Sequence, residues 1–198
     1  MNEQIFLAST NAGKRSEFEA LLATHGLELG PAIAYPDVEE NAVDYLGNAR
    51  LKAAALHREL RRRGIAAMVI ADDSGIEVDA FAGAPGVRSA RYGGIELTWP
   101  QRRALMLGDL VDVPDALRTA SFQCVLVAID DAGNEYRGVG ETRGHIARGE
   151  RGEGGFGYDP LFLPEGERRT YAEMSAAEKE RTSHRARALH ALIAAMRR

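Results

Sequence analysis

The chain has 198 residues, of which 45% are hydrophobic and 27% are charged. These are the proportions of an ordinary globular protein. The length fits a single domain of residues 1–198. Its net charge of −4 argues against bulk electrostatic binding to nucleic acid or to an anionic membrane. No apolar run in the sequence approaches the length of roughly 20 residues that spans a bilayer, and there is no signal-peptide pattern, so we expect a cytoplasmic protein. The one cysteine, Cys124, excludes an internal disulfide.

Strands and helices alternate in the first half of the chain. Apolar runs and helical periodicity predict a buried strand over residues 4–8, a turn over 9–13, a helix that follows it, a second helix over about 44–63, and a buried strand over 65–70. The polar residues 71–75 predict a turn that ends this strand. The alternation at 76–79 then predicts a new strand with one wet face.

The second half continues the mixture of strands and helices. We predict a helix from Thr98 to about Leu110, a strand over 122–129, a turn over 130–134, a hairpin partner near 136–142, a glycine-rich segment over 149–158, a capping box of Ser175 and Glu178, and a final helix opened by residues 183–185. This mixture indicates an α/β fold with a mixed sheet, in one domain with two lobes.

The turn at residues 9–14 is the first candidate for phosphate binding. A helix N-terminus presents unpaired N–H groups and the positive end of the helix dipole, which suit a phosphate. The stretch departs from the P-loop pattern, because Ala8 stands at its first glycine and Arg15 at its magnesium-binding Ser/Thr. A plain strand-to-helix turn is the alternative.

Two adjacent carboxylates, Asp72 and Asp73, follow the second predicted strand. At the carboxyl edge of a sheet, where α/β proteins bind ligands, they would suit Mg²⁺, which takes one or two carboxylates together with substrate phosphate oxygens. Glu39 and Glu40, just before the second helix, supply a further carboxylate. A solvated turn is the alternative for the Asp pair.

Two further segments carry candidate base-binding residues. In the glycine-rich run at 154–160, glycines flank Phe156, so that backbone and ring can approach a flat base; a glycine-rich hairpin is the alternative. His184 and Arg185 open the last helix, where they oppose the helix dipole and need an anionic or acceptor partner. As an isolated pair they would more often be surface residues.

Lysine is rare in this chain. Lys14, Lys52 and Lys179 are the three lysines among 25 basic residues, so the other 22 are arginine. Because arginine serves wherever a generic positive charge suffices, we expect the lysines to mark places that need a compact ammonium.

Together these motifs resemble the inosine/xanthosine triphosphate pyrophosphatase family. The resemblance rests on STNAGK, EEN, NARLKA, ADDSG, GAPG, SARY, GEGGFGYDP, EK and SHR, in this order, from Ser9 to the final helix. It implies an elongated α/β fold with two lobes around a central substrate cleft, Mg²⁺ dependence, a homodimer, and hydrolysis of ITP, dITP and XTP to monophosphate and pyrophosphate. The departures are mild: Ser9 stands where Thr is common, and Gly47 where a larger residue often precedes the Asn.

The resemblance also implies residue roles. The triphosphate would be bound by Ser9, Thr10, Asn11, Ala12, Gly13, Lys14, Lys52 and Lys179. Mg²⁺ would be held by Glu40 and Asp73, with Asp73 also the proton acceptor for the attacking water and Asp72 its electrostatic support. The substrate would contact Ser74, its base would be framed by Phe156, Gly157, Tyr158 and Asp159, and the 6-oxo edge would be read by His184 and Arg185.

Other functions stay open on residues alone. A phosphatase would need a carboxylate nucleophile in an Asp-x-Asp arrangement, whereas Asp72 and Asp73 are adjacent. A kinase would use the same two carboxylates differently. A noncatalytic nucleotide sensor would keep the glycine-rich run but has no need of paired carboxylates. A nucleic-acid-binding module is disfavoured by the acidic balance.

Overall fold

The computed structural model describes residues 4–197, and the chain divides into two compact units. The first unit comprises residues 4–73, 124–140 and 185–197, and the second unit comprises residues 74–123 and 141–184.

One mixed sheet contains the five strands β1 (Ile5–Leu7), β2 (Met68–Val78), β3 (Thr119–Ile129), β4 (Glu135–Ile146) and β5 (Phe162–Pro164), in this order. Strand β1 pairs in parallel with β2, and β4 pairs antiparallel with β5. The unit boundary falls within β2, β3 and β4. The predicted α/β fold with a mixed sheet is confirmed.

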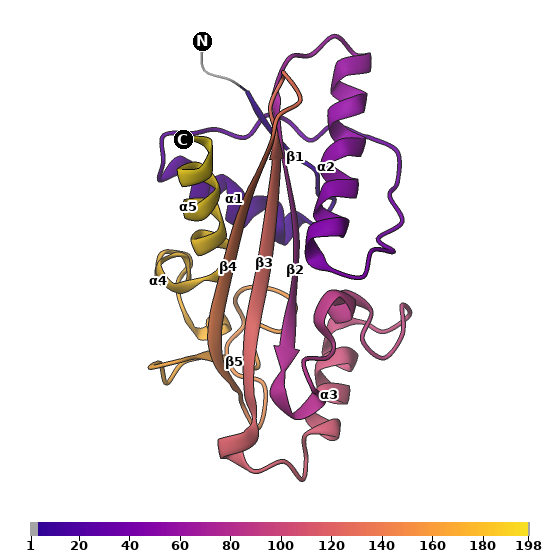
Figure 1. The fold of residues 1–198 in the computed structure, drawn as a ribbon. Coiled ribbons are helices and arrows are strands. Elements are labelled where there is room, and N and C mark those ends of the chain that lie inside the picture. Colours follow the sequence, from indigo (N-terminus) through magenta and orange to yellow (C-terminus); the bar gives the residue numbers. More distant parts are fainter. Residues whose placement is uncertain (1–3, 198) are drawn as a thin grey trace. The chain divides into compact units, whose positions relative to one another are not determined.

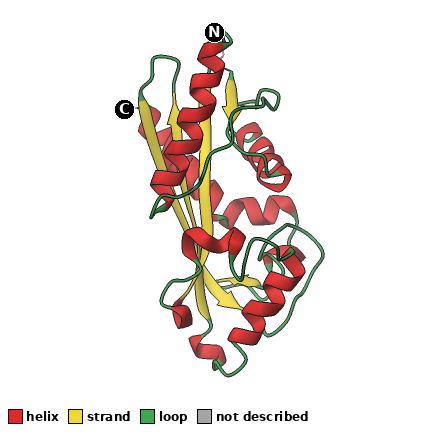
Figure 2. Cartoon of the chain, turned by 90° about the vertical axis from the view of Figure 1, so that its right-hand side faces the viewer, coloured by secondary structure: helices red, strands yellow, loops and turns green. Residues whose placement is uncertain are grey.

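In the first unit, helices cover both faces of the sheet. Helices α1 (Ala12–Ala23) and α5 (His184–Met196) lie on one face, and α2 (Tyr45–Arg62) lies on the other (Figures 1 and 2). Strand β2 packs against the helices on both faces of the sheet, because successive side chains of a strand point to opposite faces. Met68 and Ile70 pack with α1 and α5, whereas Val69 and Ala71 pack with α2.

The second unit has its own core. It contains helices α3 (Trp99–Asp109) and α4 (Ala176–Thr182) and the short 3-10 turns Asp79–Phe81, Gly86–Arg91, Asp115–Leu117 and Tyr171–Glu173. Its buried side chains come from the end of β2, α3 and the residue after it, β3, β5, the last of these turns and the loop before β5, and include Ile76, Val78, Met106, Leu110, Phe122, Tyr158, Phe162 and Tyr171. Four of these are aromatic, and they pack among aliphatic side chains.

The predicted break after residue 70 is wrong. Strand β2 starts at Met68 rather than residue 65 and runs without interruption to Val78, so residues 71–75 form no turn and 76–78 belong to the same strand. Asp72 and Asp73 therefore lie in the middle of a strand, with 1% and 5% of their surface exposed, and not at the carboxyl edge of a sheet. The alternative of a solvated turn is wrong for the same reason.

Most other predicted elements are confirmed. Helix α2 begins after the N-cap Asp44, and α3 begins after Thr98, whose N–H donates to Gln101 Oε1 at 2.9 Å. The predicted capping box of α4 forms between Ser175 and Glu178. The β3–β4 hairpin is longer than predicted, because β3 begins at Thr119 and β4 continues to Ile146. Cys124 is buried in the core of the first unit.

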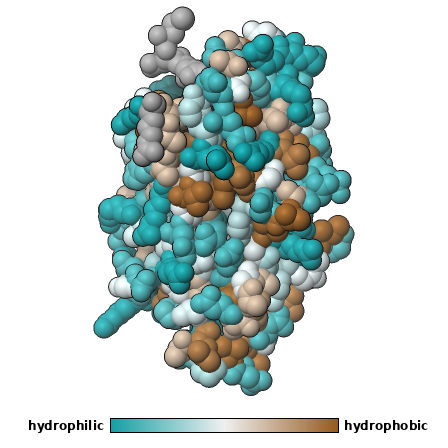
Figure 3. Space-filling view, viewed as in Figure 1, coloured by the Kyte–Doolittle hydropathy of each residue, from teal (hydrophilic) through white to brown (hydrophobic). Residues whose placement is uncertain are grey.

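The surface agrees with the composition. Figure 3 shows one face, on which hydrophilic residues predominate and hydrophobic residues form separate patches. None of the helices formed by residues 4–197 combines the length and the apolarity that crossing a bilayer requires.

Candidate functional site

Asp72 is a buried carboxylate held between two cations. Asp72 lies on the same face of β2 as Met68 and Ile70, the face that packs against α1 and α5. These two helices supply its partners. Lys14 Nζ lies 2.8 Å from Asp72 Oδ1, and Arg185 Nε lies 3.5 Å from Asp72 Oδ2. Burial raises the pKa of Asp72, but Lys14, Arg185 and Lys52 outweigh burial and hold the pKa below its usual range. Asp72 is therefore ionised at neutral pH.

Asp73 faces the other helical layer, toward α2. Lys52 Nζ lies 3.3 Å from Asp73 Oδ1 and 3.0 Å from Glu40 Oε2, so one ammonium joins both carboxylates. Asn48, one helical turn before Lys52, donates its Nδ2–H to Asp73 Oδ2 at 3.1 Å. This i,i+4 spacing places both side chains on one face of α2. The two residues therefore hold Asp73 from two directions.

The two neighbouring aspartates have opposite pKa shifts. Burial raises the pKa of Asp73, and Glu40 raises it further, while Lys52, Lys14 and the Asn48 hydrogen bond offset only part of the rise. Burial lowers the pKa of Lys52, but Asp73, Asp72 and Glu40 outweigh it and raise the pKa, so the ammonium stays charged. Asp73 thus has a raised proton affinity beside a fixed positive charge, as a general base requires.

Glu40 and Asp73 fit a magnesium site. They are two carboxylates that already share one positive charge, the Lys52 ammonium, and Mg²⁺ commonly takes one or two carboxylates together with phosphate oxygens and water. Among residues 4–197 there is no group of three or more His, Cys, Asp or Glu side chains arranged to hold a metal. A cation here would therefore draw its remaining ligands from substrate and water.

The predicted phosphate-binding turn forms the start of α1. Asn11 is the N-cap: its Oδ1 accepts from Lys14 N at 3.1 Å, and its own N–H donates to Ser9 Oγ at 3.2 Å. Thr10, Asn11 and Ala12 are exposed, so this helix end is open to a ligand. The helix begins at Ala12, two residues earlier than a turn over residues 9–13 allows.

In the second unit, Asp159 anchors the glycine-rich loop. It is 3% exposed, and its Oδ2 accepts from Phe156 N at 2.9 Å and lies 2.6 Å from Lys179 Nζ. Gly155 has φ +69°, and a Cβ there would lie 2.1 Å from Asp159 Oδ2, so the loop needs glycine at this position. The Lys179 ammonium also lies 5.2 Å from the centre of the Phe156 ring. The loop has no hairpin, and the hairpin alternative is wrong.

The rest of the loop is fixed by the core of the second unit. Tyr158 is 2% exposed and donates its O–H to Ser89 O at 3.0 Å, so its ring is a core residue. Arg103, from α3, donates to Gly157 O at 2.9 Å. Of the predicted base-framing residues, Phe156 is half-buried, whereas Gly157, Tyr158 and Asp159 are buried.

His184 and Arg185 are consecutive, but they belong to different units. His184 is 1% exposed and stacks on Phe122 within the second unit. Arg185 is 5% exposed, and its Nη1 donates to Glu17 Oε2 at 2.8 Å within the first unit. The interpretation of this pair as surface residues is therefore wrong.

The structure separates the predicted residues into two groups. The first unit holds Ser9, Thr10, Asn11, Ala12, Gly13, Lys14, Glu40, Lys52, Asp73 and Arg185, and the second unit holds Ser74, Phe156, Gly157, Tyr158, Asp159, Lys179 and His184. The sequence joins the groups directly at Asp73–Ser74 and at His184–Arg185. Each of the three lysines lies against a carboxylate. The expectation that they mark places needing a compact ammonium stays a prediction.

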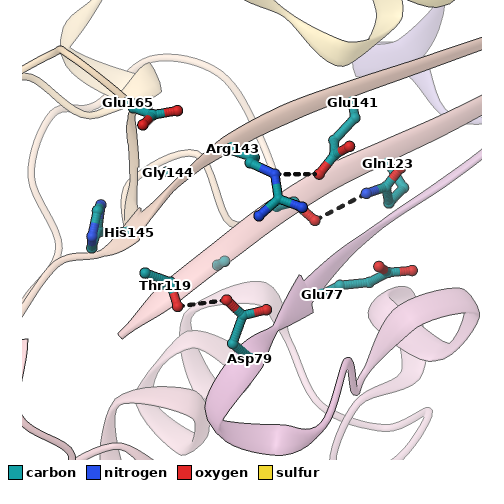
Figure 4. A pocket seen from close by; sticks show the side chains of 11 residues that line it. Glu77, Asp79, Thr119, Gln123, Glu141, Arg143, Gly144, His145 and Glu165 are labelled. Atoms are coloured by element: carbon teal, nitrogen blue, oxygen red, sulfur yellow. Dashed lines mark hydrogen bonds and ion pairs between the residues drawn. The ribbon is translucent and has the colours of Figure 1, made fainter. Parts of the chain in front are cut away.

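A groove in the second unit involves none of the predicted residues. It is lined by Glu77 of β2, by Asp79 of the turn after it, by residues of β3 and β4, and by Glu165 (Figure 4). Within it, Arg143 pairs with Glu141 and Thr119 donates to Asp79. Its excess of carboxylates is unsuited to a triphosphate.

Residue-level reasoning had assigned no role to four residues that contact the candidate site. These are Glu17, Asn48, Phe122 and Tyr171. Asn48 was detectable, because it lies four residues before Lys52 in a predicted helix. Glu17 and Phe122 meet Arg185 and His184 across 168 and 62 positions of the sequence, which local periodicity does not report. Tyr171 lies only eight positions before Lys179, but the two belong to different elements, a 3-10 turn and α4.

Comparison with known proteins finds relatives that match nearly the whole chain. The model of the Ham1 family matches residues 5–195. The dITP/XTP pyrophosphatase of Opitutus terrae is 44% identical over 194 residues, covering 93% of this chain and 94% of the relative, and that of Geobacillus kaustophilus is 46% identical over 192 residues, covering 94% and 91%. A solved HAM1 protein from Coxiella burnetii is 35% identical with a TM-score of 0.81, covering 98% of both chains. This chain therefore belongs to the Ham1 family.

Proposed function

We propose that this chain is a nucleoside triphosphate pyrophosphatase that hydrolyses non-standard purine nucleotides, ITP, dITP and XTP, to the monophosphate and pyrophosphate. One observation carries the proposal: Lys52 holds Asp73, a buried aspartate of raised pKa, together with Glu40, while Lys14 pairs with Asp72 on the opposite face of the same strand. The names of the relatives, dITP/XTP pyrophosphatase, support the substrate class.

The proposed reaction adds water across the bond between the α- and β-phosphates. The water oxygen forms a bond to the α-phosphorus, the bond from that phosphorus to the bridging oxygen breaks, and pyrophosphate leaves. Asp73 accepts the proton of the water, a role that suits its raised pKa. Lys14 and Lys52 stabilise the negative charge of the triphosphate and of the leaving group.

Mg²⁺ is part of the proposal. Glu40 and Asp73 would hold it, and when bound it would neutralise charge on the phosphate oxygens as a Lewis acid. Asn48 and Lys52 keep both carboxylates in place, and the exposed N-terminus of α1 adds N–H donors for phosphate oxygens.

Lys179 is assigned to the triphosphate together with Lys14 and Lys52. Base recognition is assigned to His184, Arg185 and the loop at residues 156–159. Hypoxanthine and xanthine present a 6-oxo group, to which His184 and Arg185 can donate, whereas adenine presents an amino group at that position. Guanine shares the 6-oxo group, so its rejection depends on the loop at residues 156–159. A homodimer and a substrate site formed by residues of both lobes also belong to the proposal, and the family resemblance supports both. A cytoplasmic location completes it, and the sequence supports this location because it shows no signal-peptide pattern.

A substrate panel tests the proposal. We expect kcat/KM for ITP and XTP to exceed that for ATP by at least about a hundredfold, because a site built to donate to a carbonyl leaves buried donors unpaired against an amine. The panel is measured at one enzyme concentration with ITP, XTP, ATP and GTP, with MgCl₂ and with a chelator. Equal kcat/KM for ITP and ATP would show that the base assignment is wrong, and full activity in chelator would remove Mg²⁺ from the proposal.

A further inference from the structure

His184 lies flat against an aromatic ring. Its imidazole and the ring of Phe122, on β3, have centroids 4.7 Å apart and planes inclined by only 8°. Both side chains are buried, with 1% of His184 and 8% of Phe122 exposed. Phe122 lies outside every motif on which the family resemblance rests.

The ring of Phe122 is itself held by two others. Phe162 meets it edge-on at 4.7 Å and 62°, and Tyr171 stacks on it at 6.1 Å and 27°. Phe162 and Tyr171 contact each other at 5.3 Å, and they are 0% and 1% exposed. Because close-packed rings have little freedom to tilt, Phe122 presents a fixed flat surface to His184.

We propose that Phe122 is a positioning residue for base specificity: its ring sets the plane of the His184 imidazole and thereby the direction in which that imidazole donates a hydrogen bond. This inference rests on the proposed function, in which His184 reads the 6-oxo edge of the base. The N–H groups of an imidazole lie in the ring plane, and a hydrogen bond weakens steeply as its angle falls below about 120°. A ring free to tilt would lose this directional selection between a carbonyl and an amine.

Replacement of the flat ring tests the inference. For Phe122→Leu we expect the ratio of kcat/KM for ITP to that for ATP to fall by about two- to tenfold, the fold-change that corresponds to the loss of one aromatic pair. The ratio is taken on one preparation, so the fraction of folded enzyme cancels and partial unfolding does not obscure the result. Phe122→Met, a flexible filler of the same space, should lower the ratio in the same way, and Phe122→Tyr, which keeps the flat face, should retain it.

Phe6→Leu is the matched control. It makes the same substitution at another buried phenylalanine, which packs in the core of the first unit against α2 and lies outside the aromatic cluster around Phe122. It should lower the melting temperature without changing the ITP to ATP ratio. An equal fall in the ratio for Phe6→Leu and Phe122→Leu would mean that general loosening of the protein is responsible, and the positioning role would be wrong.

A double-mutant cycle identifies the route of the effect. If Phe122 acts through His184, then Phe122→Leu should change the ratio in the wild-type background and leave it unchanged in a His184→Ala background. An undiminished effect in the His184→Ala background would overturn the inference. If the wild-type protein itself fails to prefer ITP, the proposed base recognition fails; if it prefers ITP and Phe122→Leu keeps that preference, only the positioning role fails.

Discussion

Asp73→Asn is expected to lower kcat for ITP by about 10²–10⁴-fold, the usual loss when general-base assistance is removed. Asparagine keeps the size of the side chain and can still accept from Asn48 Nδ2, but it takes no proton from water and is a poorer ligand for a divalent cation. The measurement is initial rate against ITP concentration for both proteins at saturating MgCl₂.

The same variant should keep or gain stability. The pKa of Asp73 is raised in the folded chain, so ionisation of Asp73 costs more free energy in the folded state than in the unfolded state. The native state therefore becomes more stable as pH falls from above the folded pKa to the pKa of Asp73 in the unfolded chain. A neutral asparagine removes this cost, and Lys52 keeps Glu40 as a partner. Activity above about a tenth of wild type, or a large fall in melting temperature, would contradict the role assigned to Asp73.

Asp72→Asn, the same substitution one residue earlier, should have the opposite effect on stability. It leaves Lys14 and Arg185 without a buried carboxylate between them, and breaking a buried ion pair typically costs about 3–5 kcal/mol. We expect a loss of unfolding free energy at the lower end of this range, about 3 kcal/mol, because Arg185 still forms its ion pair with Glu17 in the variant. In a chain of this length that is a fall in melting temperature of roughly 6–12 °C.

The pH dependence of this loss has a definite sign. The pKa of Asp72 is lowered in the folded chain, so its contribution is complete above the unfolded pKa of about 3.9 and is lost as pH falls through the folded value. The melting temperatures of wild type and Asp72→Asn should therefore differ at pH 7 and converge below about pH 4. Equal melting temperatures for the two proteins at pH 7 would contradict the anchoring role.

The contrast between these aspartates shows where sequence reasoning failed. Polar residues 71–75 have the composition of a turn, yet they continue β2. The charges are tolerated because each face of the strand meets its own cations: Lys14 and Arg185 on one side and Lys52 on the other. These partners lie 58, 113 and 21 positions away in the sequence, beyond the reach of local pattern rules.

Other predictions held because their physical causes are local. The starts of α2 and α3 and the capping box of α4 depend on residues within one turn of each other. The expectation drawn from the rarity of lysine stays a prediction, because contact with a carboxylate does not distinguish the lysines: Arg50 and Arg148 also pair with carboxylates. The stack of His184 on Phe122 joins residues 62 positions apart, and no short motif encodes it.

The products formed from ITP test the central claim most directly. Purified protein is incubated with ITP and MgCl₂, and orthophosphate is measured with and without an added inorganic pyrophosphatase. Hydrolysis between the α- and β-phosphates predicts IMP, and orthophosphate only when the second enzyme is present, at two per ITP consumed. Orthophosphate released without the second enzyme, together with IDP, would contradict the account and identify a phosphatase that acts on the terminal phosphate.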